Sequence, residues 1–339
     1  MKQYKTKEYN LHKERPQVLF LGNGILLSGD KGKRWDQVLD DLKDKNKADF
    51  PTNDNGVPYS IKALMVCADN DIVRRKKYFE YFNPSAKEKS DNSSKYEYSE
   101  TNLLLEKLLS LNFDSIITTN YTYEIESFFK KDYVNLARKN NYAFELNKKI
   151  KKNESNDEND IKKESVTKLL NVCALNIIPD KNGENHEIWH IHGEARNKSS
   201  FVLTHDEYPR LIHSIVEYNR RNGNRYELCS ENLEMHSWID YFIMGDVYIL
   251  GFGFDFSEID LWWLLNRRHR EKEKVGEMHF FEPQKDGNKT SDVKEVLKRL
   301  NVRVHDMDVE IKNTDDYILF YQKSINKINE MVKERRQNK

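Results

Sequence analysis

The pattern of apolar and polar positions predicts short buried strands that alternate with amphipathic helices. A run of four apolar residues, 18–21, ends in a Gly-Asn-Gly turn at 22–24, and apolar residues at helical spacing follow over 35–42. The same order returns where the apolar run 247–250 ends in a Gly-Phe-Gly turn at 251–253 and leads into a second helical stretch. The sequence therefore predicts two units of strand, glycine turn and helix.

Further strands and helices are expected along most of the remaining chain. Short β-branched or apolar runs predict strands at 115–120, 188–193, 201–204, 278–281 and 302–304. Helical spacing of apolar residues predicts helices at about 61–82, 103–111, 207–222, 229–243 and 292–300, and a long amphipathic helix at the C-terminus. This alternation favours an α/β fold with a doubly wound, mostly parallel sheet, because parallel neighbours need crossover helices.

The chain is expected to form a single domain over residues 1–339, with its core at about 17–306. Two stretches, 83–99 and 148–164, are rich in charged and small polar residues and poor in apolar ones. Such segments cannot bury enough apolar surface to order themselves, so mobile surface insertions are predicted there. Residues 307–339 are expected to add a C-terminal helical extension.

In a doubly wound sheet, ligands bind beyond the carboxyl ends of the strands. Here that edge would carry Gly22, Asn120, His192, Gly251 and Glu282. A glycine at a strand end lets the backbone approach a pyrophosphate, and the amides at the start of the next helix favour an anion. A tight turn without any ligand is the alternative for both glycine turns.

Two histidines and one asparagine are the candidate chemical groups. His190 and His192 lie two positions apart on a predicted strand and would share one face, but spacing indicates no third ligand, so no metal site is expected. His190 is predicted to be buried and hydrogen-bonded. His192 precedes a glycine at a strand end, where an imidazole can accept a proton near neutral pH. The amide of Asn120 can position a water or a ribose hydroxyl, or cap the following turn.

Composition narrows the function classes. The 339 residues hold 56 Lys and Arg and 56 Asp and Glu, so no net charge draws the chain to nucleic acid, and direct nucleic-acid binding is not expected. The basic cluster at 267–270 suits an exposed helix end as well as a local nucleic-acid contact. Three widely spaced cysteines, Cys67, Cys173 and Cys229, exclude a disulfide framework and favour a reduced cytoplasm. No apolar run is long enough to span a membrane.

Five short motifs occur in one order along the chain. They are Leu21-Gly22-Asn23-Gly24, Thr118-Thr119-Asn120-Tyr121 with Glu126, His190-Ile191-His192-Gly193, Leu203-Thr204 with Tyr208, and Leu250-Gly251-Phe252-Gly253 with Asp260. Together they resemble the sirtuin-like domains of bacterial antiphage defence. The resemblance covers roughly residues 17–283.

The resemblance implies a Rossmann-like, sirtuin-type core that takes NAD as substrate and hydrolyses it to nicotinamide and ADP-ribose during abortive infection. It makes Asn120 and His192 the catalytic residues, with His192 as general base. The residues expected to bind the nucleotide are Gly22, Asn23, Gly24, Thr119, Tyr121, Gly251, Gly253, Asp260 and Glu282. Deacylation and zinc are not expected, because true sirtuins hold zinc through four cysteines and this chain has three.

Two departures from the family pattern keep a second function open. Asn23 and Ile25 stand where alanine and serine are common, and Thr122 stands where an aspartate is frequent. The alternative is a noncatalytic NAD- or ADP-ribose-binding regulatory or scaffold subunit of a defence complex. Few residues follow the core, so control is expected to come from a homo-oligomer or from a second defence protein, a sensor or ATPase encoded nearby. Candidate contact surfaces are the apolar stripe of the C-terminal helix and the Trp262-Trp263 region.

Overall fold

The computed structural model describes most of the chain. The described residues are 7–28, 33–46, 57–66, 70–82, 100–130, 168–170, 172–179, 183–224, 226, 232–272, 274–284 and 292–337. Both predicted surface insertions, 83–99 and 148–164, lie outside them, as do Cys67 and Cys229.

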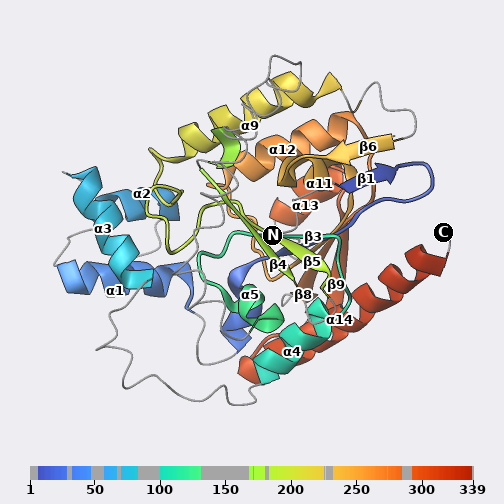
Figure 1. Ribbon diagram of the computed structural model, residues 1–339. Helices are drawn as coiled ribbons and strands as arrows, with labels where there is room; N and C mark the ends of the chain where they lie inside the picture. The colour runs from blue at the N-terminus through green and yellow to red at the C-terminus, as the bar shows by residue number, and fades with distance from the viewer. Residues whose placement is uncertain are drawn as a thin grey trace.

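A sheet forms the centre of the molecule (Figure 1). It has seven strands in the order β4-β5-β3-β2-β7-β8-β9. Its strands are β2 (Gln17–Leu21), β3 (Ser115–Thr118), β4 (Ala174–Pro179), β5 (Asn185–His190), β7 (Asp246–Leu250), β8 (Met278–Gln284) and β9 (Arg303–Glu310). Every neighbouring pair is parallel except β4 with β5, which is antiparallel. Numbered along the chain, the parallel strands follow the 3-2-1-4-5-6 order of a doubly wound Rossmann-type sheet. The predicted fold class is confirmed.

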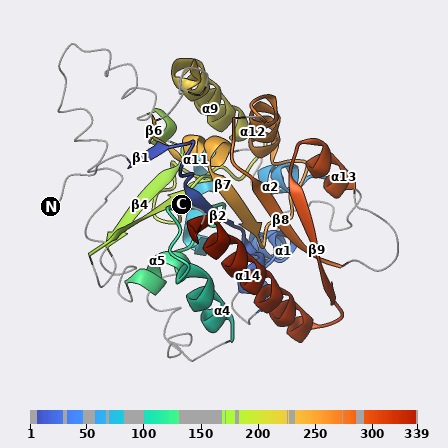
Figure 2. The same ribbon diagram turned by 90° about the vertical axis from the view of Figure 1, so that its right-hand side faces the viewer.

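Helices cover both faces of the sheet (Figures 1 and 2). One apolar core lies under α9 (Tyr208–Asn222), α11 (Trp238–Met244), α12 (Ile259–Arg270) and α13 (Asp292–Arg299). The opposite core lies under the 3-10 helix η1 (Asn23–Ser28), α1 (Trp35–Asn46), α2 (Tyr59–Met65), α3 (Asp71–Phe82), α4 (Glu100–Leu109), α5 (Glu124–Phe129) and α14 (Thr314–Gln337). Figure 2 shows α4 and α14 side by side on this second face.

The central strand β2 shows why an unbroken apolar run forms a strand here. Its side chains alternate between the two cores, Val18 and Phe20 on one side, Leu19 and Leu21 on the other. All four are buried. A strand that is covered on both faces reads as continuously apolar rather than alternating, which is typical of parallel sheets under two helical layers.

Two predicted helices were wrong in part. The stretch 61–82 holds two helices, α2 and α3, instead of one. The stretch 229–243 begins, in its described part, with strand β6 (Asn232–Met235), which pairs antiparallel with β1 (Lys7–Asn10). Helix α11 begins only after Ser237, whose side chain accepts a hydrogen bond from the first turn as an N-cap.

The strand predicted at 201–204 was also wrong. The backbone N–H groups of Leu203 and Thr204 donate to the buried Glu207 carboxylate, at 2.8 and 3.1 Å, rather than to another strand. A carboxylate that accepts two backbone N–H groups holds this segment as a loop at the start of α9. The loop is pinned next to the candidate site, because the Val202 N–H donates to the carbonyl of His192.

The C-terminal helix α14 does not offer its apolar stripe to a partner. Tyr321, Ile325, Ile328 and Val332 are buried in the second core, and Ile318 packs against it. The stripe therefore stabilises the chain's own fold, and the prediction that it is a contact surface was wrong.

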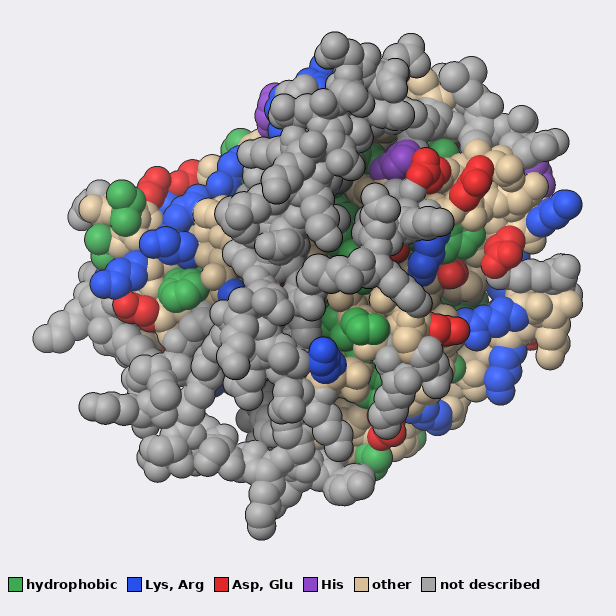
Figure 3. Space-filling model, viewed as in Figure 1, with side chains coloured by type: hydrophobic (Ala, Val, Ile, Leu, Met, Phe, Trp, Pro, Cys, Tyr) green, Lys and Arg blue, Asp and Glu red, His purple; other side chains and the backbone are tan. Residues whose placement is uncertain are grey.

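The described surface carries charges of both signs, as expected from the equal numbers of basic and acidic residues. On the face drawn in Figure 3, Lys and Arg side chains lie among Asp and Glu side chains rather than forming one continuous basic area. Within the described part of the chain, every helix is too short or too polar to cross a lipid bilayer.

Candidate active site

Asn120 and His192 lie at the carboxyl ends of adjacent parallel strands. Thr118 at the end of β3 pairs with His190 at the end of β5, and each chain runs two residues further to Asn120 and His192. The Ile191 N–H still donates to the Thr118 carbonyl at 3.0 Å, so the two segments stay paired beyond the strands. The structure thus places both predicted catalytic residues at one edge of the sheet, the edge where doubly wound folds bind nucleotides.

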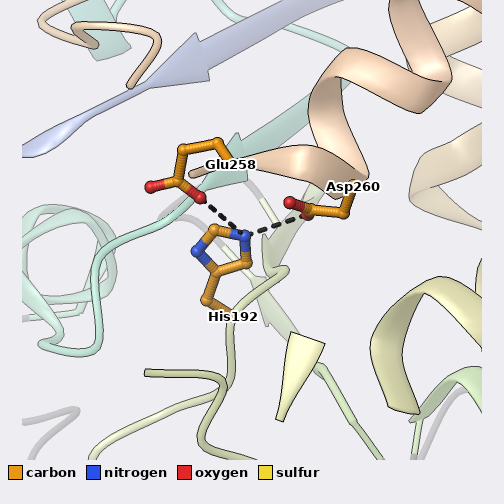
Figure 4. A group of neighbouring side chains, drawn as sticks. All are labelled: His192, Glu258 and Asp260. Atoms are coloured by element: carbon orange, nitrogen blue, oxygen red, sulfur yellow. Dashed lines mark hydrogen bonds and ion pairs between the residues drawn. The ribbon is translucent and has the colours of Figure 1, made fainter. Parts of the chain in front are cut away.

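Two carboxylates converge on one nitrogen of the buried His192 ring (Figure 4). Nε2 lies 3.0 Å from Oδ2 of Asp260 and 3.5 Å from Oε2 of Glu258. The hydroxyl of Tyr208 donates to the same Glu258 oxygen at 2.7 Å, and its ring packs edge-on against the imidazole. This is the group of residues that we call the His192 cluster: His192, Glu258, Asp260 and Tyr208.

The cluster changes the proton affinity of its members. Burial disfavours the charged form of the imidazole, but the charges of Glu258 and Asp260 outweigh it and raise the pKa of His192 to about 9. Burial raises the pKa of Glu258 to about 7, against the opposing effect of the His192 charge. At neutral pH His192 is therefore an imidazolium hydrogen-bonded to Asp260, and Glu258 beside it is divided between its charged and neutral forms.

Glu258 and Asp260 reach His192 through the segment 251–258, which follows β7. This segment has to pass over β2 and β3, since both strands lie between β7 and β5 in the sheet. Phe254 within it has a positive φ of 51°, an uncommon conformation for a bulky residue. Its buried ring packs against Phe252, Trp262 and Phe280, which holds the segment in place. Asp260 then falls in the first turn of α12, where the helix dipole favours a negative charge.

Sequence reasoning named three of the four members of this cluster, His192 and Asp260 as site residues and Tyr208 within a motif. It named Asp260 as a nucleotide contact, whereas the structure buries Asp260 against His192. It did not single out Glu258. The available signal was a pair of carboxylates two residues apart at the start of a helix that follows a strand-end glycine turn.

The backbone of Asn120 is fixed on both sides by buried groups. Its N–H donates to Oγ1 of Thr118 at 3.1 Å, and its carbonyl accepts a hydrogen bond from Nδ1 of His190 at 2.5 Å. Nε2 of His190 donates to Glu126 at 2.6 Å, and the same Glu126 oxygen accepts from Asn176. His190 is thus buried and hydrogen-bonded, as predicted. Its partners are separate from those of His192, which lies beyond the end of β5 and contacts Asp260 instead.

Replacing Glu126 by glutamine is expected to lower the free energy of unfolding by roughly 3 kcal/mol, because it removes one partner of a buried ion pair. Burial disfavours charge on His190, yet Glu126 raises its pKa from 6.5 to about 9. The stability gained is complete below about pH 6.5 and is lost as pH rises through about 9. Urea denaturation at pH 6 and pH 9 measures this loss.

The expected result is a smaller difference between the two pH values in Glu126→Gln than in the wild type. The control is Glu106→Gln on the exposed side of α4, which should leave the difference unchanged. An equal pH dependence in Glu126→Gln and the wild type would show that the pair does not hold the proton.

The two glycine turns pack directly on each other at the point where the strand order reverses. The N–H groups of Gly22 and Gly24 donate to the carbonyls of Leu250 and Gly251. A Cβ at Gly22 would lie 2.3 Å from the Gly251 oxygen, so this close approach requires a glycine. The tight-turn alternative accounts for Gly22 without a ligand. Gly253, by contrast, faces open space.

The remaining predicted nucleotide residues are spread over the same edge. The hydroxyl of Tyr121 donates to the Val202 carbonyl, and its ring lies in an aromatic group with Phe82. Among the described residues neither Tyr121 nor Glu282 joins the His192 cluster; Glu282 pairs with Lys294 at 3.3 Å. The Asn23 side chain donates to the Lys33 carbonyl, and Thr119 is half-buried. Their role in binding a nucleotide stays a prediction.

The spacing of the cluster would also admit a metal ion. One donor atom each of His192, Glu258 and Asp260 lie within 4.8 Å of one another, close enough to ligate one divalent cation. The hydrogen bond from Nε2 to Asp260 accounts for the shortest contact with a proton alone. We therefore treat the cluster as an acid–base group.

Comparison with known proteins identifies the family. No curated protein matches the chain. The SIR2-like domain family matches residues 114–305, which is more than half of the chain and includes Asn120, His192 and the whole His192 cluster. The matched region also spans the parallel strands β3, β5, β7 and β8 and the first residues of β9. The chain belongs to the SIR2-like domain family, whose members bind NAD.

Proposed function

We propose that this protein hydrolyses NAD to nicotinamide and ADP-ribose, and that it acts in antiphage defence by depleting NAD. The observation that carries the catalytic proposal is the meeting of Asn120 and His192 at adjacent strand ends, with two carboxylates on His192. The defence role is supported by the ordered sequence motifs alone.

The residues at this edge match the needs of glycosidic cleavage. As the bond between the nicotinamide nitrogen and the ribose carbon breaks, its electron pair leaves with nicotinamide and the sugar becomes oxocarbenium-like. The oxygen of a water then bonds to that carbon, and the proton that the water loses goes to His192 and on to solvent. Asn120 is suited to orient the water or a ribose hydroxyl: no partner for its side-chain amide lies in the described part of the chain. Burial of the site keeps its dipoles fixed and excludes bulk water.

Release of nicotinamide from NAD tests the proposal directly. Asn120→Ala and His192→Ala are each expected to reduce release by a factor of about a thousand, in the range of a lost acid–base or positioning group. Thermal unfolding of both variants should stay close to that of the wild type. His12→Ala is the matched control, because His12 is exposed and lies far from His192 in the sequence, and this variant should keep full activity. No release by the wild type, alone or with proteins encoded by neighbouring genes, would falsify the proposal.

A noncatalytic NAD- or ADP-ribose-binding subunit is the second candidate, favoured by one observation. An imidazolium held between Glu258 and Asp260 cannot accept a proton. Calorimetry separates the two functions, because NAD that binds with a stable heat signature and is recovered intact indicates a binding subunit.

Control by assembly is part of the same proposal. A hydrolase that is always active would exhaust its host's NAD, so we expect the purified chain to be an oligomer of low activity or to need a partner protein. Light scattering combined with the nicotinamide assay measures this. A strict monomer with full activity and no partner would contradict control by assembly and leave hydrolysis standing.

A further inference from the structure

The contacts of His192 leave one ring nitrogen for chemistry. Nε2 faces both carboxylates and can carry only one proton toward them. Nδ1 lies on the side of the ring away from Asp260 and makes no hydrogen bond with any described residue (Figure 4). A neutral ring with its proton on Nε2, donated to Asp260, would have its lone pair on Nδ1.

The two carboxylates have different surroundings. Asp260 is fully buried, and its Oδ1 has no hydrogen-bond partner in the described structure, so the His192 ring is the one described side chain that hydrogen-bonds its carboxylate. The Glu258 side chain keeps 15% exposure, lies 0.5 Å further from Nε2 and accepts the Tyr208 hydroxyl. Asp260 is therefore placed to hold the ring, whereas Glu258 can gain or lose a proton.

We propose that Asp260 is a positioning residue that makes Nδ1 the proton-accepting atom of His192, and that Glu258 is a lock that keeps His192 charged, hence inactive, in the resting enzyme. The inference rests on the proposed function, since it concerns the base of the same reaction. It resolves the conflict between a base and a resting imidazolium: near neutral pH, the base becomes available when the charge of Glu258 is neutralised or drawn away. Nδ1 then takes the proton of the attacking water, while Nε2 keeps its own proton and donates it in the hydrogen bond to Asp260.

The groups facing His192 from each packed element support this division. The charges acting on the ring are those of Glu258 and Asp260, at the start of α12. Tyr208 of α9 packs against the ring, and Tyr121, which follows β3, lies close enough to Glu258 and Asp260 to be affected by their charges. Burial and these charges raise the pKa of both phenols well above the usual value. Both tyrosines stay neutral, so Glu258 and Asp260 are the charged groups of the described structure that act on the ring, against the opposing effect of burial.

The test compares Glu258→Gln with Asp260→Asn by the pH dependence of nicotinamide release. In the wild type the rate should rise with pH up to about 9, where His192 loses its proton. Glu258→Gln should move this rise to lower pH and increase the rate at pH 7 by about tenfold, since one pKa unit is a factor of ten. Asp260→Asn should lower kcat at every pH with little change in KM, because the ring loses its orientation. Glu106→Gln is the control for charge change alone.

A Glu258→Gln variant whose rate at pH 7 falls, or whose pH profile matches the wild type, overturns the lock. NMR of 15N-labelled histidine tests the inference even if no variant cleaves NAD. In Glu258→Gln the pKa of His192 is expected to fall. In the wild type the neutral ring is expected to carry its proton on Nε2, and in Asp260→Asn a mixture of both tautomers is expected instead. An unchanged pKa, or a proton on Nδ1 in the wild type, would contradict the inference without bearing on whether NAD is the substrate.

Discussion

Replacing Gly22 by alanine is expected to lower the free energy of unfolding by roughly 3 kcal/mol, at the upper end of overpacking costs, and to abolish NAD binding. The added methyl would lie 2.3 Å from the carbonyl oxygen of Gly251 and 2.8 Å from its carbon. Both atoms belong to the backbone, so no side-chain rotation relieves the overlap. The two turns would have to separate at the reversal of strand order, where the ligand crevice of a doubly wound sheet lies.

Gly253→Ala is the matched control for stability, because a Cβ there meets nothing within 4 Å. It is no control for NAD binding, since Gly253 is itself a predicted nucleotide contact. Urea denaturation should show near wild-type stability for Gly253→Ala and a large loss of stability for Gly22→Ala. Calorimetry measures NAD binding by both variants. If both variants lose NAD binding but keep their stability, the glycines act by contact with the ligand, and the packing explanation given for Gly22 is wrong.

The sheet could be predicted because its information is local. In β2 and β7 the apolar run, the glycine turn and the following helix occupy consecutive residues, so the pattern itself marks the strand end. The placement of Asn120 and His192 followed from the same logic, because each lies directly after a strand whose neighbour was implied by parallel order. β6 escaped detection because its alternation of exposed and buried positions lasts only four residues and runs into a strongly apolar helix.

The His192 cluster could not be predicted in full, because its contacts are not local. Asp260 lies 68 residues from His192 and enters from β7, which β2 and β3 separate from β5. Nothing in the spacing of the sequence says how far the 251–258 segment reaches over these strand ends. The position of that segment depends on the packing of Phe254, a tertiary effect that hydrophobic periodicity does not report.

Arg268→Met is expected to lower the free energy of unfolding by at least about 4 kcal/mol, because each buried carbonyl left without a donor costs about 1–3 kcal/mol. The guanidinium of Arg268 donates to four backbone carbonyls, those of Phe242, Ile243, Gly245 and Gly276. Two of them belong to the last turn of α11, whose carbonyls lack partners within the helix. Burial lowers the pKa of Arg268 to about 9, so the group is still charged at neutral pH.

This role corrects the view of residues 267–270 as an exposed basic helix end, since Arg268 is buried and faces the interior. Arg270→Met removes the same side chain from an exposed position two residues away and should change stability little. Urea denaturation of both variants at pH 7 measures the difference. Equal stabilities of the two variants would show that the four carbonyls find other donors. They would also show that the link which Arg268 makes between the end of α11, at Phe242, and the segment before β8, at Gly276, does not stabilise the fold.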